Sequence, residues 1–181
     1  MPNFEDLVRS AEAYADVFDR AKLERPPRRK LAIVTCMDAR IDPYGLLGLH
    51  EGDAHVIRNA GGVITDDEIR SLAISQRLMG TEIIILIHHT DCGMQAFDDV
   101  EFRAQLEEET GVPVPWDTEA FSDVELDVRK SVARIVESPF IPHRDQVRGF
   151  VYEVETGVLR LVPQAVSYTH LRAPETVLDL V

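Results

Sequence analysis

The chain of 181 residues lacks the features that mark membrane and secreted proteins. It has no run of roughly 18 apolar residues, the length of a membrane span, and its first residues mix charges with apolar side chains instead of forming the apolar core of a signal peptide. It has only two cysteines, too few for a disulfide framework. We therefore expect a cytoplasmic protein that does not associate with a membrane.

Basic residues are scarce as well. The 19 Lys and Arg residues are outnumbered by 32 Asp and Glu residues, which gives a formal net charge of -13 at pH 7. Proteins that bind nucleic acids usually present a basic surface that neutralises phosphates, so nucleic acid is not an expected partner. A glycine-rich phosphate-binding loop is also absent, because "GLLGLHEG" lacks the required spacing and the preceding strand. No nucleotide cofactor is expected.

What the chain does contain is enough apolar sequence, 45% of its residues, for one compact domain. Three short apolar runs predict strands at 31–36, 54–60 and 81–89. The first and third runs are too continuously apolar to have a face in water, which is typical of parallel strands covered on both sides. Between the second and third strands, a capping box of Thr65 with Glu68 predicts the start of a helix. The order strand, helix, strand predicts a right-handed crossover between parallel strands.

Further helices are predicted by apolar periodicity and by helix breakers. Gly80 should end the helix that Thr65 begins. An amphipathic helix is expected over 4–22, and a polar helix over 98–109. A last helix should begin at Ser122, with Glu125 as its capping-box partner, and end before Pro139.

The C-terminal part of the domain reads as antiparallel. Residues 148–162 predict a hairpin with Thr156 and Gly157 at its turn. The expected fold is therefore α/β: a single domain, residues 1–162, in which a small mostly parallel β-sheet is flanked by helices and completed by a C-terminal antiparallel strand or hairpin. Residues 163–181 resemble a vector-derived scar, although a native helix that docks through Val177, Leu178 and Leu180 is the alternative.

Both cysteines follow predicted strands, at the edge of the sheet where ligands bind in open α/β folds. Cys36 closes the first strand, and Cys92 follows the third in "HHTDCGM". The patterns C-x-D-x-R and H-x-x-C can thus bring Cys36, His89 and Cys92 to one point. Two thiolates and one imidazole are three ligands of a tetrahedral zinc site, which leaves a fourth position for water or substrate. The sequence therefore predicts a zinc centre.

Other interpretations of these residues stay open. A Cys36–Cys92 disulfide is disfavoured in a cytoplasmic protein, the C-x-x-C motif of thiol redox chemistry is absent, and a Cys-His nucleophile would leave one cysteine without a role. His88 competes with His89 as a ligand. Because neighbouring residues of a strand face opposite sides, only one of the two should point at the metal. We favour His89, three residues before Cys92, and expect His88 to be packed and hydrogen-bonded.

Together, "CMDAR", "RNAGG" and "HHTDCGM" resemble the β-class carbonic anhydrases, and the similarity extends from about residue 11 to residue 162. The resemblance implies that Cys36, His89 and Cys92 bind zinc, and that Asp38 and Arg40 form a catalytic pair beside the metal. It implies reversible hydration of CO2 to bicarbonate by a metal-bound hydroxide. It also implies a homodimer, possibly assembled into a tetramer, with the site near the subunit interface.

Within this resemblance, Asp38 should orient the attacking oxygen, and Arg40 should hold Asp38 through a bidentate pair. In the closed form seen in the family, Asp38 becomes a fourth zinc ligand instead, so a pH-gated site is a hypothesis for this chain. The alternative is that Asp38 and Arg40 form an exposed ion pair that contributes little to stability. Gly61, Gly62 and Gly93 should let the backbone approach the substrate pocket, although Gly62 serves equally well as a turn glycine.

Three further residues near these motifs, Asp42, Arg58 and Asn59, are expected to have general structural roles. Two other functions remain compatible with the sequence. The chain could hydrolyse carbonyl sulfide or carbon disulfide with the same zinc site. It could also be a non-catalytic zinc-binding or bicarbonate-binding protein in which Asp38 permanently covers the metal.

Overall fold

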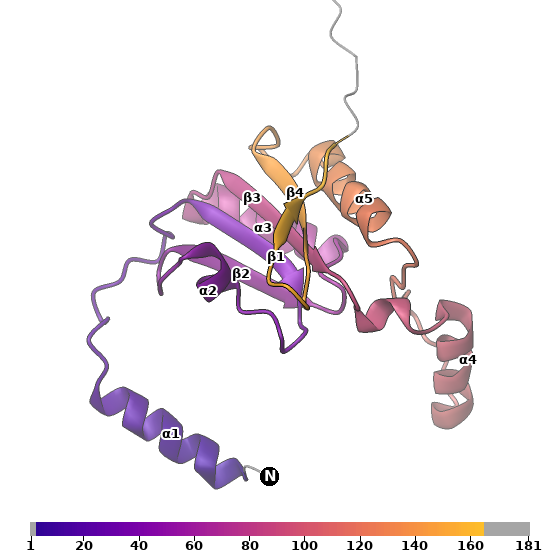
Figure 1. Ribbon diagram of the computed structural model, residues 1–181, viewed down its shortest axis with the longest axis horizontal. Helices are drawn as coiled ribbons and strands as arrows, with labels where there is room; N and C mark the ends of the chain where they lie inside the picture. The colour runs from indigo at the N-terminus through magenta and orange to yellow at the C-terminus, as the bar shows by residue number, and fades with distance from the viewer. Residues whose placement is uncertain (1–2, 165–181) are drawn as a thin grey trace, which may run out of the picture.

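A five-stranded sheet in the order β2-β1-β3-β4-β5 forms the centre of the molecule (Figure 1). The computed structural model describes residues 3–164. The strands are β1 (Leu31–Cys36), β2 (Ala54–Asn59), β3 (Ile83–His89), β4 (Val147–Tyr152) and β5 (Leu159–Leu161). The pairs among β1 to β4 are parallel, and β5 runs antiparallel to β4. The predicted α/β fold, with its mostly parallel sheet and C-terminal antiparallel pair, is confirmed.

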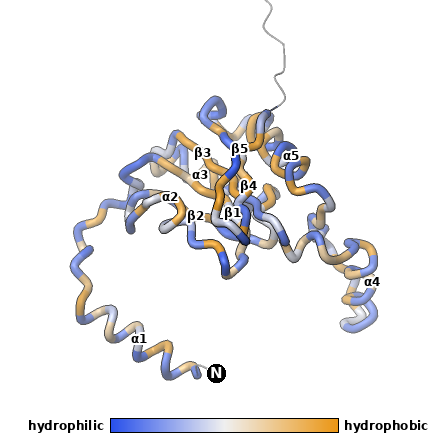
Figure 2. Tube along the Cα trace, viewed as in Figure 1, coloured by the Kyte–Doolittle hydropathy of each residue, from blue (hydrophilic) through white to orange (hydrophobic). Residues whose placement is uncertain are grey.

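Helices cover the two faces of the sheet unequally. The helical segments are α1 (Phe4–Asp16), α2 (Pro43–Leu47), α3 (Asp66–Met79), the 3-10 turn η1 (Gly93–Gln95), α4 (Asp99–Thr110) and α5 (Val124–Glu137). One face packs against α3 and α5 around Leu72, Leu86 and Val132. The other face packs against α2 and the loop after it, around Ile33 and Leu49. Figure 2 shows the apolar residues concentrated in these central strands.

Burial on both faces explains the apolar runs in the sequence. Every residue of β1 is buried, so neither face of the strand meets water and its residues do not alternate between polar and apolar. Because β1 lies between β2 and β3 and all three are parallel, their carboxyl ends meet at one edge of the sheet. Cys36 is the last residue of β1, and His89 is the last residue of β3.

Helices α1 and α4 extend away from the sheet (Figure 1), and neither contains a buried residue. The helix predicted over 4–22 ends at Asp16. A helix of this length gains most of its stability from packing. Because α1 has no buried residue, packing does not stabilise further helical turns after Asp16. Among residues 3–164, no helix has the length and apolar character that crossing a membrane requires.

The predicted helix boundaries are partly right. The Thr65–Glu68 capping box is present, and Gly80 ends α3 in a left-handed conformation. For α5 the prediction was wrong by one residue: the cap is Asp123, whose carboxylate accepts from the Leu126 N–H, and Glu125 pairs with Arg129 instead of capping. Aspartate caps a helix as well as serine does, so the pattern alone could not separate the two positions.

The chain reverses between β4 and β5, as predicted. The backbone N–H groups of Thr156 and Gly157 both donate to the carbonyl of Glu153, which closes the turn. The short segments α2 and η1 were not predicted. The predicted tail spans residues 163–181, and all of it after residue 164 lies outside the described part of the chain.

Candidate metal centre

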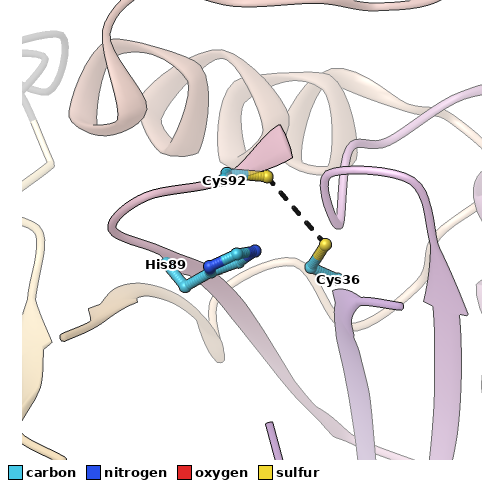
Figure 3. Close-up of side chains that lie close together, drawn as sticks. All are labelled: Cys36, His89 and Cys92. Atoms are coloured by element: carbon cyan, nitrogen blue, oxygen red, sulfur yellow. Dashed lines mark hydrogen bonds between the residues drawn. The ribbon is translucent and has the colours of Figure 1, made fainter. Parts of the chain in front are cut away.

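Three buried side chains converge where β1 and β3 end: Cys36, His89 and Cys92 (Figure 3). Their ligand atoms all lie within 4.8 Å of one another, and the two sulfurs are 4.0 Å apart. Both cysteines are free. A disulfide needs its sulfurs about 2.05 Å apart, whereas two thiolates on one tetrahedral zinc ion are separated by about 3.8 Å. The sulfur separation therefore fits a shared metal ion and does not fit a disulfide.

The ring of His89 is oriented toward the two sulfurs by its own backbone. Its Nδ1–H donates to the Thr90 carbonyl at 2.8 Å, which leaves the Nε2 lone pair free. Nε2 is buried and has no hydrogen-bond partner within residues 3–164. Buried polar atoms without a partner are rare in native proteins, and a metal-bound histidine commonly donates its other nitrogen to a carbonyl in this way. The donor set therefore fits zinc.

His88 points to the other side of β3, as strand alternation requires. Its Nε2–H donates to the Gly62 carbonyl at 2.9 Å, and its ring stacks on Phe121. It is fully buried and takes no part in the cluster of ligand atoms. The structure thus brings His89 to the two cysteines and leaves His88 packed and hydrogen-bonded.

The two thiols are hydrogen-bonded to each other. The hydrogen bond with Cys92 lowers the pKa of the Cys36 thiol to about 4, while the same interaction raises the pKa of Cys92 above its ordinary range. Burial lowers the pKa of His89, but the Cys36 thiolate beside the ring more than offsets this, so the net pKa is raised. The cluster therefore attracts positive charge, as a cation site should.

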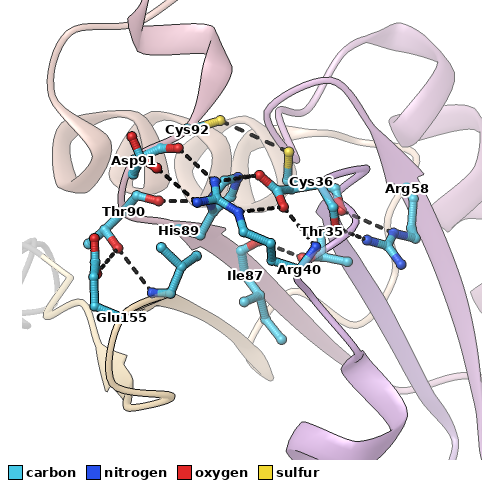
Figure 4. A network of polar contacts seen from close by, with 12 residues as sticks. Thr35, Cys36, Arg40, Arg58, Ile87, His89, Thr90, Asp91, Cys92 and Glu155 are labelled. Atoms are coloured by element: carbon cyan, nitrogen blue, oxygen red, sulfur yellow. Dashed lines mark hydrogen bonds and ion pairs between the residues drawn. The ribbon is translucent and has the colours of Figure 1, made fainter.

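Asp38 lies beside the cluster, and its carboxylate accepts hydrogen bonds from Arg40, which Figure 4 labels next to His89. Arg40 donates from Nε to Oδ1 at 3.0 Å and from Nη2 to Oδ2 at 2.8 Å, and its backbone N–H also donates to Oδ1. These side-chain and backbone hydrogen bonds hold the pKa of Asp38 well below its usual range. Oδ2 is 3.8 Å from Nε2 of His89. The carboxylate is thus ionised and close to the ligand atoms.

Arg40 also contacts Asp91, a residue for which the sequence analysis assigned no role. Nη1 donates to the Asp91 carboxylate at 2.8 Å, and Nη2 donates to the Asp91 carbonyl at 2.9 Å. Asp91 has a positive φ of 52°, a conformation that few residues other than glycine adopt. Arg40 therefore joins the loop after β1 to the loop after β3. In the sequence, the one feature that could have indicated this role is the position of Asp91 between His89 and Cys92.

Arg58 has a more specific place than the general structural role expected of it. Its Nε donates to the Cys36 carbonyl at 3.0 Å, and its Nη2 donates to the Asp38 carbonyl at 2.7 Å (Figure 4). Both acceptors belong to the loop that carries the first cysteine. Asp42 caps α2, and the Asn59 amide donates to the Val63 carbonyl, so these two residues stabilise backbone.

The glycines near the site differ in what they require. Gly62 has a φ of 73°, and a Cβ atom there would come within 2.9 Å of the backbone nitrogen of Cys36. Gly61 has a φ of 84°, and its Cβ would meet Met94 and Val63 at 3.1 Å. At Gly93, nothing in the described chain lies within 4 Å of an added Cβ. Close backbone approach therefore explains Gly61 and Gly62 but not Gly93.

Comparisons with known proteins agree with this geometry. Residues 31–112 match the family model described as "Carbonic anhydrase". β-Carbonic anhydrase 1 of Mycobacterium tuberculosis is 51% identical over 158 residues, which cover 87% of this chain and 96% of the relative. Carbon disulfide hydrolase of Acidithiobacillus thiooxidans is 35% identical over 162 residues, with coverage of 78% and 81%.

Among solved structures, carbonic anhydrase from Streptococcus mutans superimposes with a TM-score of 0.83 at 43% identity. The match covers 90% of this chain and 99% of the other. Sequence similarity and the arrangement of strands thus extend over nearly the same length. The chain belongs to the β-carbonic anhydrase family.

Proposed function

We propose that the protein is a zinc enzyme that catalyses the reversible hydration of CO2 to bicarbonate. The observation that carries the proposal is the buried cluster of two thiols and one unpartnered imidazole nitrogen, with an ionised carboxylate beside it. Stopped-flow measurement of CO2 hydration by the purified protein tests it directly. The absence of any hydration at neutral or alkaline pH would contradict it.

Cys36, His89 and Cys92 would hold the metal. Zinc bound there would act as a Lewis acid that lowers the pKa of a water molecule from about 15.7 toward neutrality. Two thiolates cancel the formal charge of the ion, so a well-placed acceptor in the protein matters more than it does beside neutral ligands. We also propose a cytoplasmic location, as the sequence analysis expects.

Asp38 is that acceptor in our proposal. Its ionised carboxylate accepts a hydrogen bond from the attacking oxygen and directs the oxygen lone pair toward the carbon of CO2. Arg40 keeps the carboxylate in position, since three of its N–H groups donate to Asp38. Gly61 and Gly62 let the backbone pack closely beside the site, and Gly93 is kept as a proposed backbone position of the substrate pocket.

The closed form, in which Asp38 itself becomes a metal ligand, requires these hydrogen bonds to break. The intact pair supports an open site in this chain, and breakage of the pair would close it. If closure depends on pH, the rate of CO2 hydration changes between about pH 6.5 and 9, where such a group should titrate. A rate that stays constant across this interval would contradict a pH gate. The same intact pair argues against a non-catalytic protein in which Asp38 permanently covers the metal.

The second candidate function is hydrolysis of carbon disulfide or carbonyl sulfide with the same residues. It is favoured by the 35% identity to a carbon disulfide hydrolase, and disfavoured by the 51% identity to a β-carbonic anhydrase. Release of hydrogen sulfide from both sulfur substrates should be measured on the preparation used for CO2 hydration. Our proposal expects CO2 hydration to have the higher kcat/KM, and the reverse order would assign the protein to the hydrolases.

We further propose that the protein acts as a homodimer, with tetramers as a possible higher assembly. The support is the apolar face of α1, whose exposed side chains include Phe4 (80% exposed) and Leu7 (61%). A helix of 13 residues, none of them buried, would be marginal in water. A second copy of the chain, covering this face, supplies the missing packing.

A further inference from the structure

A buried pair of titratable residues lies behind the candidate metal centre and has no part in the proposed chemistry. His88 belongs to β3 and is fully buried, and Asp127 belongs to α5 with 14% of its side chain exposed. Nδ1 of His88 and Oδ2 of Asp127 are 3.4 Å apart. The pair therefore joins α5 to the strand that carries His89.

The donors and acceptors around the two side chains determine where their protons lie. The Gly62 carbonyl can only accept, so Nε2 of His88 carries a proton and donates it there at 2.9 Å. Nδ1 of His88 and Oδ2 of Asp127 are both buried and face each other at 3.4 Å, and neither has a hydrogen-bond partner of standard geometry within the described chain. Each satisfies the other if one proton lies between them, whichever of the two atoms carries it.

This contact fixes the His88 ring from its second side. The Gly62 carbonyl holds one nitrogen, Asp127 holds the other, and Phe121 stacks on the ring with centroids 5.9 Å apart. Gly62 in turn packs against the backbone of Cys36, because a Cβ at Gly62 would lie 2.9 Å from the Cys36 nitrogen. A continuous series of contacts thus leads from α5 to a candidate zinc ligand.

We infer that Asp127 is a positioning residue for the metal centre: its carboxyl group, 3.4 Å from Nδ1 of His88, fixes the ring that holds the Gly62 carbonyl, and through Gly62 the backbone of Cys36, in the geometry that binds zinc. Asp127 touches neither metal nor substrate. The inference rests on the proposed zinc site. Residues that orient metal ligands typically change metal affinity by about 10-fold to 100-fold when they are replaced.

The test compares three variants by zinc affinity, measured by competition with a chromophoric chelator. Asp127→Ala removes the carboxyl group that faces Nδ1 of His88 and should weaken zinc binding by about 10-fold or more. Asp127→Asn keeps a donor for Nδ1, so its affinity should stay close to that of the wild type. Glu137→Gln makes the same carboxylate-to-amide change at an exposed position of the same helix and should have no effect. The absorption spectrum of the cobalt-substituted proteins should change only for Asp127→Ala.

Equal zinc affinity and equal cobalt spectra in Asp127→Ala and the wild type would overturn the inference. If Asp127→Ala does not fold, the nitrogen NMR spectrum of the zinc-loaded wild type decides instead. A protonated His88 Nε2 with a hydrogen-bonded Nδ1 is expected, and an unprotonated Nε2 would overturn the inference. A wild type that binds no zinc would contradict the proposed function itself, so the two failures are distinguishable.

Discussion

At the scale of single residues, Arg40 joins the two loops that carry the candidate ligands. Its guanidinium donates two hydrogen bonds to Asp38, in the loop after β1, and two to Asp91, in the loop after β3. A lysine carries the same charge but cannot form these planar, paired contacts. The shape of the side chain therefore matters here as much as its charge.

Arg40→Lys should lower kcat/KM for CO2 hydration by about 10-fold to 100-fold while the zinc content stays near one ion per chain. The reason is that Asp38 loses its fixed orientation, whereas the three ligands remain. Stopped-flow kinetics and metal analysis on one preparation check this. Arg70→Lys is the matched control, since Arg70 pairs with Asp67 on the exposed surface of α3. Unchanged kinetics in Arg40→Lys would show that the pair has no role in catalysis.

Gly62 offers a second test at this scale. Gly62→Ala should destabilise the protein by about 1 to 3 kcal/mol, because the new Cβ meets the backbone of Cys36 and the positive φ is strained. Gly111→Ala separates the two causes: Gly111 has a φ of 70°, but no other atom of residues 3–164 lies within 4 Å of an added Cβ. Urea denaturation of both variants measures the difference. Equal losses would mean that the contact with Cys36 adds nothing to the strain.

At the scale of elements, the contact between α5 and β3 makes stability depend on pH in two opposite ways. Burial raises the pKa of Asp127 to about 6, so from about pH 4 to 6 the folded state holds a proton that the unfolded state has lost. This contribution to stability falls as pH rises. Burial lowers the pKa of His88 to about 4, so its contribution rises with pH over nearly the same interval. The two contributions offset each other.

Asp127→Asn removes the contribution of Asp127 to the pH dependence of stability and keeps that of His88. Between pH 4 and 6, its stability should rise relative to that of the wild type by about 1 to 3 kcal/mol, since a shift of one pKa unit corresponds to about 1.4 kcal/mol. Denaturation in urea at the two pH values measures this difference. The charges of Lys130 and Glu119 act on Asp127 in opposite directions and remain in both proteins. Parallel pH dependence of the two proteins would contradict the prediction.

Much of this arrangement could be predicted from the sequence because it is local. The apolar run 31–36 predicts a buried strand, and the sequence alone places Cys36 at its end and His89 three residues before Cys92. The contact between His88 and Asp127 could not be predicted, because it depends on how α5 packs against the sheet. The cap of α5 was missed because Ser122 and Asp123 are equally good caps. Asp91 was missed because a left-handed aspartate in a loop has no sequence pattern of its own.

At the scale of the whole molecule, α1 is the clearest sign of a larger assembly (Figure 1). Leu7→Glu should convert a dimer into monomers, since it places a charge in the apolar face that we expect a second copy to cover. Arg9→Glu introduces the same side chain on the polar face and should leave the dimer intact. Light scattering coupled to size-exclusion chromatography measures both masses. A monomeric wild type would contradict the proposed homodimer.

The central claim is that Cys36, His89 and Cys92 bind one zinc ion that is required for CO2 hydration. The most direct measurement is zinc content together with the rate of CO2 hydration, for the wild type and for Cys92→Ala. We predict about one zinc ion per chain and rapid hydration in the wild type, and loss of both in the variant, because only two ligands remain. A wild type without zinc, or full activity in Cys92→Ala, would contradict the account.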